Sequence, residues 1–286
     1  MVNQLFTFFR QRHRRWVYGL ISSLVALGLV VGTAQSTPAI SLIELLFRGA
    51  QIIQLSNMSD RQEMSLGSQI NDELVGPGGQ FTLYDDNDEI IEYVEDIGNG
   101  LVPHSQRPNI DYVFQVVEDD AINAFAAMGG YIYVTTGLMK AADNEAQLAS
   151  VIGHEIGHVV GRHSVKQLRE AAIAQGLMSA AGVEDSVLVN IAVELGVARP
   201  HSRSDEREAD TYGLDNITKA GYAPSAMPAF MEKLLSSGAP PQFLSTHPST
   251  RSRIEDLNEQ IDPATADQGK GLDNDAYRTI VAELSS

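Results

Sequence analysis

The feature that most restricts the fold of this 286-residue chain is the segment His154-Glu155-Ile156-Gly157-His158. On a helix, residues i and i+4 share one face, so both histidines can present their imidazoles to a single metal ion. Glu155 is rotated by about 100° from His154, which places it near the metal but outside the coordinating set. There it can act as a general base on the attacking water, whose pKa the metal lowers toward roughly 7.

An amphipathic helix with two surface histidines is the plainer explanation of this segment. The neighbouring residues are apolar: Val151, Ile152, Ile156, Val159 and Val160. Imidazoles set in so apolar a surface need polar partners, because burying an unsatisfied polar group is costly. The sequence therefore favours a metal-binding helix.

A catalytic zinc site takes three protein ligands and keeps one open position, so a third ligand has to be found. His163 does not fit, because on a continuing helix it points about 140° away from His158. We expect His163 to interact with the carbonyl groups at the end of the helix instead.

The segment Ser204–Asp210 (SDEREAD) offers better candidates for the third ligand. Glu206 and Asp210 have i, i+4 spacing and share a helical face, so one can bind the metal while the other orients a ligand histidine. Glu208 lies about 200° around the helix from Glu206 and is expected to face solvent or a salt partner.

Taken together, the HExxH segment and the SDEREAD segment resemble the gluzincin metallopeptidases that include the CAAX prenyl protease and HtpX. The similarity is strongest to the bacterial periplasmic BepA-like branch, and it runs from about Asp60 to Ile261. The runs Ala121–Leu138 and Ser245–Arg253 are also typical of this family. The resemblance implies an α+β, zincin-like fold that is mainly helical, with a small sheet, an open edge strand and an active-site helix carrying HExxH.

The resemblance also implies roles for individual residues. Asn123 and Ala124 match an edge strand that pairs with the substrate backbone. His247 matches a histidine facing the metal, which either stabilises the oxyanion or caps the metal in a resting form, and Arg253 matches an arginine near that site. One Zn²⁺ per chain is expected, with the ligands His154, His158 and Glu206, the base Glu155 and the orienting residue Asp210.

Hydrophobic periodicity, capping residues and turn signals predict the secondary structure around these segments. A capping box at Ser59 opens a helix, and the β-branched and aromatic residues of Tyr131–Thr136, which follow the turn Gly129-Gly130, predict a strand. The expected helices cover residues 41–55, 60–74, 86–101, 144–162, 204–219 and 225–235, with strands at 111–117 and 131–136.

The ends of the chain differ from its middle. Residues 1–36, with four arginines, no acid and the apolar stretch 16–35, are expected to form a signal peptide or a single membrane anchor. This points to a bacterial periplasmic or membrane-associated envelope protein, while an acid-free, arginine-rich start leaves a mitochondrial location as the alternative. We expect an apolar helix and linker at 37–59, the metallopeptidase domain at 60–261 and an acidic tail at 262–286.

Charge and cysteine content exclude several classes of function. The formal net charge is −17, which argues against a nucleic-acid partner because phosphates need Lys and Arg contacts. The chain has no cysteine, which excludes disulfides, a thiol nucleophile and thiolate zinc ligands.

The sequence therefore predicts a zinc metalloendopeptidase, and the resemblance suggests unfolded or unassembled envelope proteins as substrates. Because the chain ends soon after Ile261 without a helical repeat domain, docking on an outer-membrane assembly machine is not expected. One alternative is a zinc-binding adaptor that holds peptides on the Tyr131–Thr136 edge without cleaving them, and another is an envelope scaffold with a metal-free site. Glu155 favours the peptidase, since a site that only binds has no use for a base.

Overall fold

A computed structural model describes residues 57–174, 185–198, 200–236, 242–248 and 250–285. The signal peptide or membrane anchor expected over residues 1–36 and the helix expected over residues 41–55 lie outside these ranges. Within the described ranges, every helix is too short or too polar to cross a membrane.

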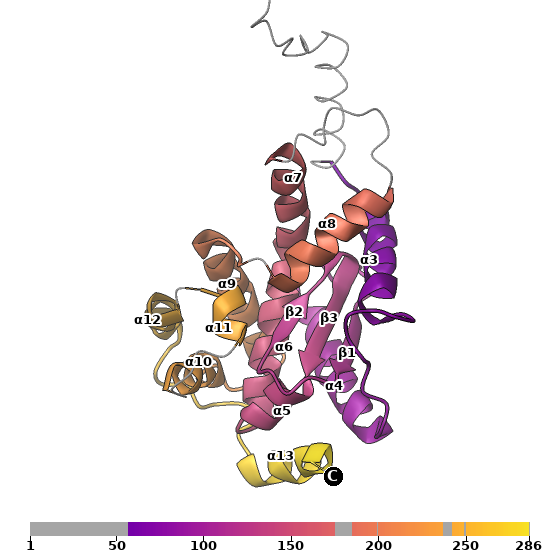
Figure 1. The fold of residues 1–286 in the computed structure, drawn as a ribbon. Coiled ribbons are helices and arrows are strands. Elements are labelled where there is room, and N and C mark those ends of the chain that lie inside the picture. Colours follow the sequence, from indigo (N-terminus) through magenta and orange to yellow (C-terminus); the bar gives the residue numbers. More distant parts are fainter. Residues whose placement is uncertain (1–56, 175–184, 199, 237–241, 249, 286) are drawn as a thin grey trace, which may run out of the picture. The chain divides into compact units, whose positions relative to one another are not determined.

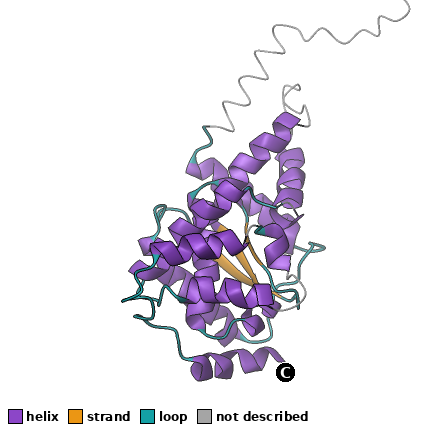
Figure 2. Cartoon of the chain, turned by 90° about the vertical axis from the view of Figure 1, so that its left-hand side faces the viewer, coloured by secondary structure: helices purple, strands orange, loops and turns teal. Residues whose placement is uncertain are grey.

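A three-stranded sheet lies among the helices, as Figures 1 and 2 show. Its strands are β1 (Val113–Val117), β2 (Ala124–Ala126) and β3 (Tyr131–Thr135). The order is β1-β3-β2, with β3 parallel to β1 and antiparallel to β2. Both expected strands are present, and the mainly helical chain with its small mixed sheet confirms the predicted α+β class.

The central place of β3 contradicts the peptide-binding edge that the adaptor alternative assumed at Tyr131–Thr136. Because β1 and β2 pair with its two sides, the Tyr131–Thr136 segment offers no free edge to a peptide. Strand propensity does not reveal the order of strands in a sheet. The edge strands are β1 and β2. Residues 82–84 bond to part of the outer side of β1, and the three side chains of β2 are all buried.

Helix α6 (Glu145–Val160) carries the HExxH residues and packs closely against α9 (Arg203–Lys219). Asn144 caps α6, since its side chain accepts a hydrogen bond from the Gln147 N–H. Small residues allow the close approach: a Cβ on Gly157 would lie 2.4 Å from the carbonyl oxygen of Ala209 on α9. The N-terminal turn of α9 is thereby held beside the histidines of α6.

The remaining helices surround this pair and the sheet (Figure 1). α3 begins with the predicted capping box at Ser59. α9 is capped by Ser202 and not by Ser204, because the Ser202 side chain accepts a hydrogen bond from the Asp205 N–H. The bounds of the other α-helices are α3 Asp60–Val75, α4 Asp88–Leu101, α5 Thr136–Ala141, α7 His163–Ala174, α8 Asp185–Ala198, α10 Ala226–Ser236, α11 Gln242–Thr246, α12 Thr250–Gln260 and α13 Asn274–Val281.

The apolar residues form two clusters that meet at the sheet. The larger one joins α4, α6, α10 and α12 to one side of the sheet, and the smaller joins α3, α7 and α8 to β2 and β3. The segment after residue 262 takes part in the larger cluster, since Tyr277 of α13 is buried and donates a 2.7 Å hydrogen bond to the carbonyl of Met139.

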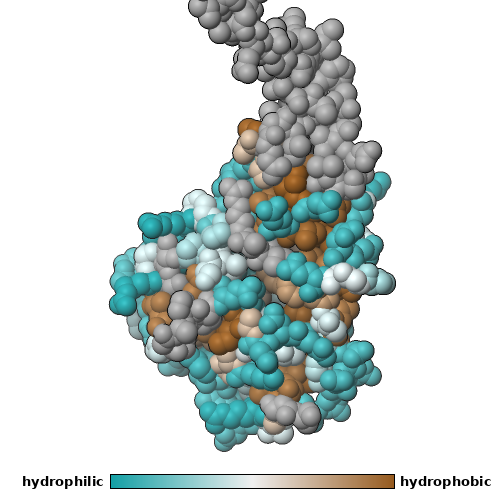
Figure 3. Space-filling model, in the orientation of Figure 1, coloured by the Kyte–Doolittle hydropathy of each residue, from teal (hydrophilic) through white to brown (hydrophobic). Residues whose placement is uncertain are grey.

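Hydrophilic residues cover most of the face shown in Figure 3, while hydrophobic residues gather over α7 and α8. Ile173, near the end of α7, is 48% exposed.

Candidate metal centre

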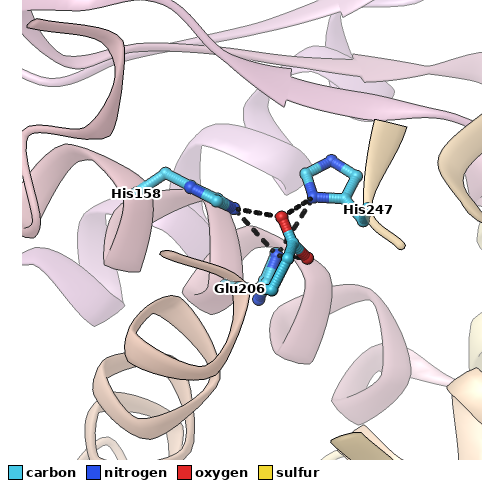
Figure 4. A group of neighbouring side chains, drawn as sticks. His158, Glu206 and His247 are labelled. Carbon is cyan, nitrogen blue, oxygen red and sulfur yellow. Dashed lines mark hydrogen bonds and ion pairs between the residues drawn. The ribbon is translucent and has the colours of Figure 1, made fainter. Parts of the chain in front are cut away.

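Four buried side chains from three parts of the chain converge on one point. His154 and His158 come from α6, Glu206 from α9 and His247 from the end of α11; Figure 4 labels the last three. One potential ligand atom of each lies within 4.8 Å of those of the others. The Nε2 atoms of His154 and His158 are 3.1 Å apart, and Glu206 carboxylate oxygens lie 3.6 Å and 3.5 Å from them. The structure thus brings the three expected metal ligands and His247 together.

The chemistry of this donor set fits a zinc ion. Imidazole nitrogens and one carboxylate are ligands that zinc prefers, and metals bind the neutral imidazole and the ionised carboxylate. Burial, and then the neighbouring His201, lowers the pKa of His158 well below its usual range. Burial would raise the pKa of Glu206, but His247, His158 and Arg253 outweigh it and hold that pKa well below its usual range. At neutral pH both groups are therefore in their metal-binding forms.

Asp210 and Arg253 contact the ligand side chains and hold them in place. Asp210 Oδ1 lies 3.0 Å from Nδ1 of His154, so the carboxylate can hold the ring with Nε2 toward the metal position. The fully buried Arg253 donates from Nε and Nη2 to the two oxygens of Asp210, at 2.6 and 2.7 Å, and from Nη1 to Glu206. Burial would raise the pKa of Asp210, but the Arg253 guanidinium keeps it below its usual range.

Asp210→Asn is expected to weaken zinc binding or turnover by about 10- to 100-fold, because an amide orients the His154 ring less firmly than a carboxylate. Competition between the protein and a chromophoric chelator measures the affinity. Asp215→Asn, a change at a partly exposed residue of the same helix that pairs with Lys219, is the control. Unchanged affinity together with unchanged turnover would remove Asp210 from the site.

Glu155 lies beside the donor group and is fully buried. Neither of its carboxylate oxygens has a hydrogen-bond partner among the described residues, and His247 Nε2 lies 3.6 Å from Oε1. Burial raises the pKa of this carboxyl group. Because buried carboxylates without a hydrogen bond are rare, the arrangement indicates that water or substrate completes the site.

His163 is not at the position that continuous helical geometry predicts. α6 ends at Val160, Arg162 has a left-handed φ of 54°, and α7 starts at His163. The chain reverses there, which brings His163 Nδ1 to 2.8 Å from Nδ1 of His158. The expected contact with helix-terminal carbonyls is wrong for that reason. Glu208 is half-exposed, and one of its carboxylate oxygens lies 3.3 Å from Nε2 of His163.

Sequence reasoning missed a fifth histidine. The His201 ring lies 4.0 Å from that of His158 and 5.6 Å from that of His247, measured between centroids. Its Nδ1 is 3.0 Å from Nε2 of Gln167. Burial, followed by the nearby His247, lowers the pKa of His201 to about 3, so the ring is uncharged at neutral pH. The sequence signal was weak: His201 precedes the cap of α9 and matches no ligand spacing.

The main chain of the edge strand β2 has a defined register. Thr135 N–H donates to the carbonyl of Asn123, and Asn123 N–H donates to Oγ1 of Thr135, both at 3.1 Å. In an antiparallel pair, alternate residues direct their main-chain groups away from the partner strand. Ala124 and Ala126 are therefore the residues whose main-chain groups face away from β3, and Asn123 is not.

Comparisons with known proteins agree on one class of relatives. The sequence profile of peptidase family M48 matches residues 91–261. The beta-barrel assembly-enhancing protease of Escherichia coli (strain K12) is 32% identical over 223 residues, which cover 72% of this chain and 45% of that protein. Metalloprotease LoiP of the same strain is 30% identical over 227 residues, covering 76% of this chain and 87% of LoiP.

A third relative comes from a eukaryote. Mitochondrial metalloendopeptidase OMA1 of Arabidopsis thaliana is 38% identical over 154 residues, which cover 52% of this chain and 31% of that protein. The chain spans less than half of the beta-barrel assembly-enhancing proteases that it matches. The M48 profile covers every metal-centre residue described above.

Proposed function

Because the chain belongs to peptidase family M48, we propose that it is a zinc-dependent metalloendopeptidase that hydrolyses peptide bonds of proteins. The observation that carries this proposal is the buried group of His154, His158 and Glu206, with the carboxylate of Glu155 beside it and without a hydrogen bond among the described residues. When bound, zinc polarises the scissile carbonyl and lowers the pKa of a water molecule toward about 7.

The protein's own groups supply the rest of the mechanism. Glu155 takes a proton from the attacking water and later delivers it to the leaving amine. Asp210 holds the ring of His154, and Arg253 fixes both Asp210 and Glu206. An extended substrate pairs with the free side of β2, where Ala124 offers its main-chain N–H and carbonyl.

Unfolded or unassembled proteins of the cell envelope are the proposed substrates. The names of the relatives, a protease that enhances β-barrel assembly and a metalloprotease of the same bacterium, support this choice. We place the protein in the bacterial periplasm or at an envelope membrane, held there through residues 16–35, with mitochondria as the alternative because of the OMA1 relative.

Zinc content and casein degradation, measured on the same preparations, test the proposal. We expect one zinc per chain and zinc-dependent cleavage, with each of His154→Ala, His158→Ala and Glu206→Ala lowering the zinc content sharply. Elemental analysis after dialysis gives the stoichiometry. Full zinc in Glu206→Ala together with loss in Glu208→Ala would show that the ligand from α9 is wrongly assigned.

The same measurements separate the alternatives. An adaptor would hold zinc and retain casein without cutting it, and the free edge available to it is β2 rather than β3. An envelope scaffold with a degenerate site would hold no metal at all. A preparation that binds zinc but leaves casein intact under every condition would favour the adaptor.

A further inference from the structure

The two histidines of α6 are held by different kinds of partner. His154 meets a carboxylate directly, because its Nδ1 is 3.0 Å from Asp210. His158 meets another imidazole, because its Nδ1 is 2.8 Å from Nδ1 of His163. In both rings the opposite nitrogen, Nε2, faces the metal position. The proposed function accounts for the first partner and assigns no role to the second.

The hydrogen bond between His158 and His163 has only one possible direction when a metal is bound. A metal at Nε2 of His158 leaves that ring's hydrogen on Nδ1, so Nδ1 must donate. Nδ1 of His163 is the acceptor, and its own ring hydrogen is then on Nε2. That atom lies 3.3 Å from Glu208 and 3.8 Å from Asp205. The contacts form a chain of donors that runs from the metal ligand to a carboxylate at the surface.

The backbone leaves space for the His163 ring. A Cβ added to Gly161 would lie 2.4 Å from Nε2 and 2.6 Å from Cε1 of His163, so a larger residue would displace the ring. The ring itself is 1% exposed. Gly161 thus lets His163 fold back over the end of α6.

Ion pairs with α3 hold the reversal in place. The buried carboxylate of Glu63 lies 2.9 Å from both Arg107 and Arg162, which bears the left-handed φ. Arg107 also donates a 2.7 Å hydrogen bond to the carbonyl of Val159 near the end of α6. The turn that places His163 is therefore fixed by charged contacts from outside the helix pair.

We propose that His163 is a positioning residue of the metal centre, which holds the His158 ring with Nε2 toward the metal; this rests on the proposed function. His163, Asp205 and Glu208 are also spaced to hold a cation of their own. However, Lys166 Nζ lies 2.6 Å from Asp205, and His163 Nδ1 already faces His158, so these groups have partners without a second metal.

Two substitutions at the same position test the proposal. His163→Leu fills a similar volume but accepts no hydrogen bond, whereas the amide oxygen of His163→Asn can take the place of Nδ1. We expect His163→Leu to weaken zinc binding by about 10- to 100-fold and His163→Asn to restore most of it. Chelator competition gives the affinity, and the visible spectrum of the Co²⁺-substituted protein reports the ligand geometry independently of activity.

Gly161→Ala disturbs the contact between His163 and His158 without removing the imidazole of His163. Because the added Cβ would displace the ring, we expect a loss of affinity and a Co²⁺ spectral change like those of His163→Leu. Gly100→Ala, where an added Cβ meets nothing within 4 Å, is the matched control and should bind zinc as the wild type does.

The outcomes separate this inference from the function on which it rests. Wild-type affinity in both His163→Leu and Gly161→Ala would overturn the positioning role, as would equal losses in His163→Leu and His163→Asn. If His163→Leu does not fold, the comparison of His163→Asn with Gly161→Ala decides. A wild-type protein that binds no zinc would instead overturn the proposed function.

Discussion

Glu155→Gln is expected to lower peptide-bond cleavage by about 10²- to 10⁴-fold while one zinc per chain stays bound. The substitution keeps the size of the side chain and removes its ability to accept a proton. Glu155 is fully buried, and its carboxylate has no hydrogen-bond partner in the part of the chain that the structure describes. Turnover of casein or a fluorogenic peptide, with zinc measured on the same sample, checks this result.

The burial of Glu155 also predicts that Glu155→Gln makes the folded protein more stable, although the same substitution lowers activity. Because burial raises its pKa above 4.5, the folded protein binds this proton more tightly than the unfolded chain does. The stability gained is complete below pH 4.5 and is lost as the pH rises through the raised value. At neutral pH, metal-free Glu155→Gln should therefore unfold at a higher temperature than the wild type, and the difference should shrink at pH 4.

Glu145→Gln at the start of the same helix is the matched control. Glu145 accepts hydrogen bonds from Tyr93 and Tyr222 and lies outside the group of metal-site residues, so turnover should stay near that of the wild type. Wild-type activity in Glu155→Gln would mean that another group takes the proton. Loss of activity together with loss of zinc would mean that Glu155 mainly holds the site together.

The parts of the site that could be predicted from sequence are those that follow from local helical geometry. The i, i+4 spacing puts His154 and His158 on one face of α6, and the same spacing puts Glu206 and Asp210 on one face of α9. The capping residues Ser59 and Asn144 place the starts of α3 and α6 correctly, because an N-cap is a local interaction.

The parts that could not be predicted depend on a single backbone angle or on long-range packing. The left-handed φ of Arg162 turns His163 toward His158. No side-chain pattern in a sequence predicts such an angle in a non-glycine residue. The order of the strands, with β3 between β1 and β2, is set by tertiary contacts, so residue patterns alone do not show it; only the family resemblance pointed to an edge strand at Asn123 and Ala124. His201 reaches the site only because the segment before α9 passes over His158.

His247 occupies the position where a fourth ligand would close the site. Its Nδ1 lies 3.2 Å from a Glu206 oxygen and 3.3 Å from His154 Nε2, and the residue is buried. The main-chain N–H of His247 donates to the carbonyl of Phe243 on α11. The Phe243 ring stacks on the imidazole of His247, with the ring centroids 4.4 Å apart. An imidazole held there would take the position that a catalytic zinc keeps open for the attacking water, so we propose a resting state that this segment keeps closed, with His247 assisting after it opens.

His247→Ala is therefore expected to raise basal cleavage of casein and to speed the binding of a small hydroxamate to the metal. If His247 instead only donates a hydrogen bond to the oxyanion, its loss lowers turnover by about 10²- to 10³-fold and leaves hydroxamate binding unchanged. The two roles thus predict opposite signs, which a single activity assay distinguishes. Thr246→Ala controls for loosening of the segment. Among the described residues, the hydroxyl that it removes bonds only to main-chain carbonyls of α11. Activity and hydroxamate binding both equal to those of the wild type would exclude His247 from the mechanism, because a residue that neither closes the site nor assists the reaction can be removed without effect.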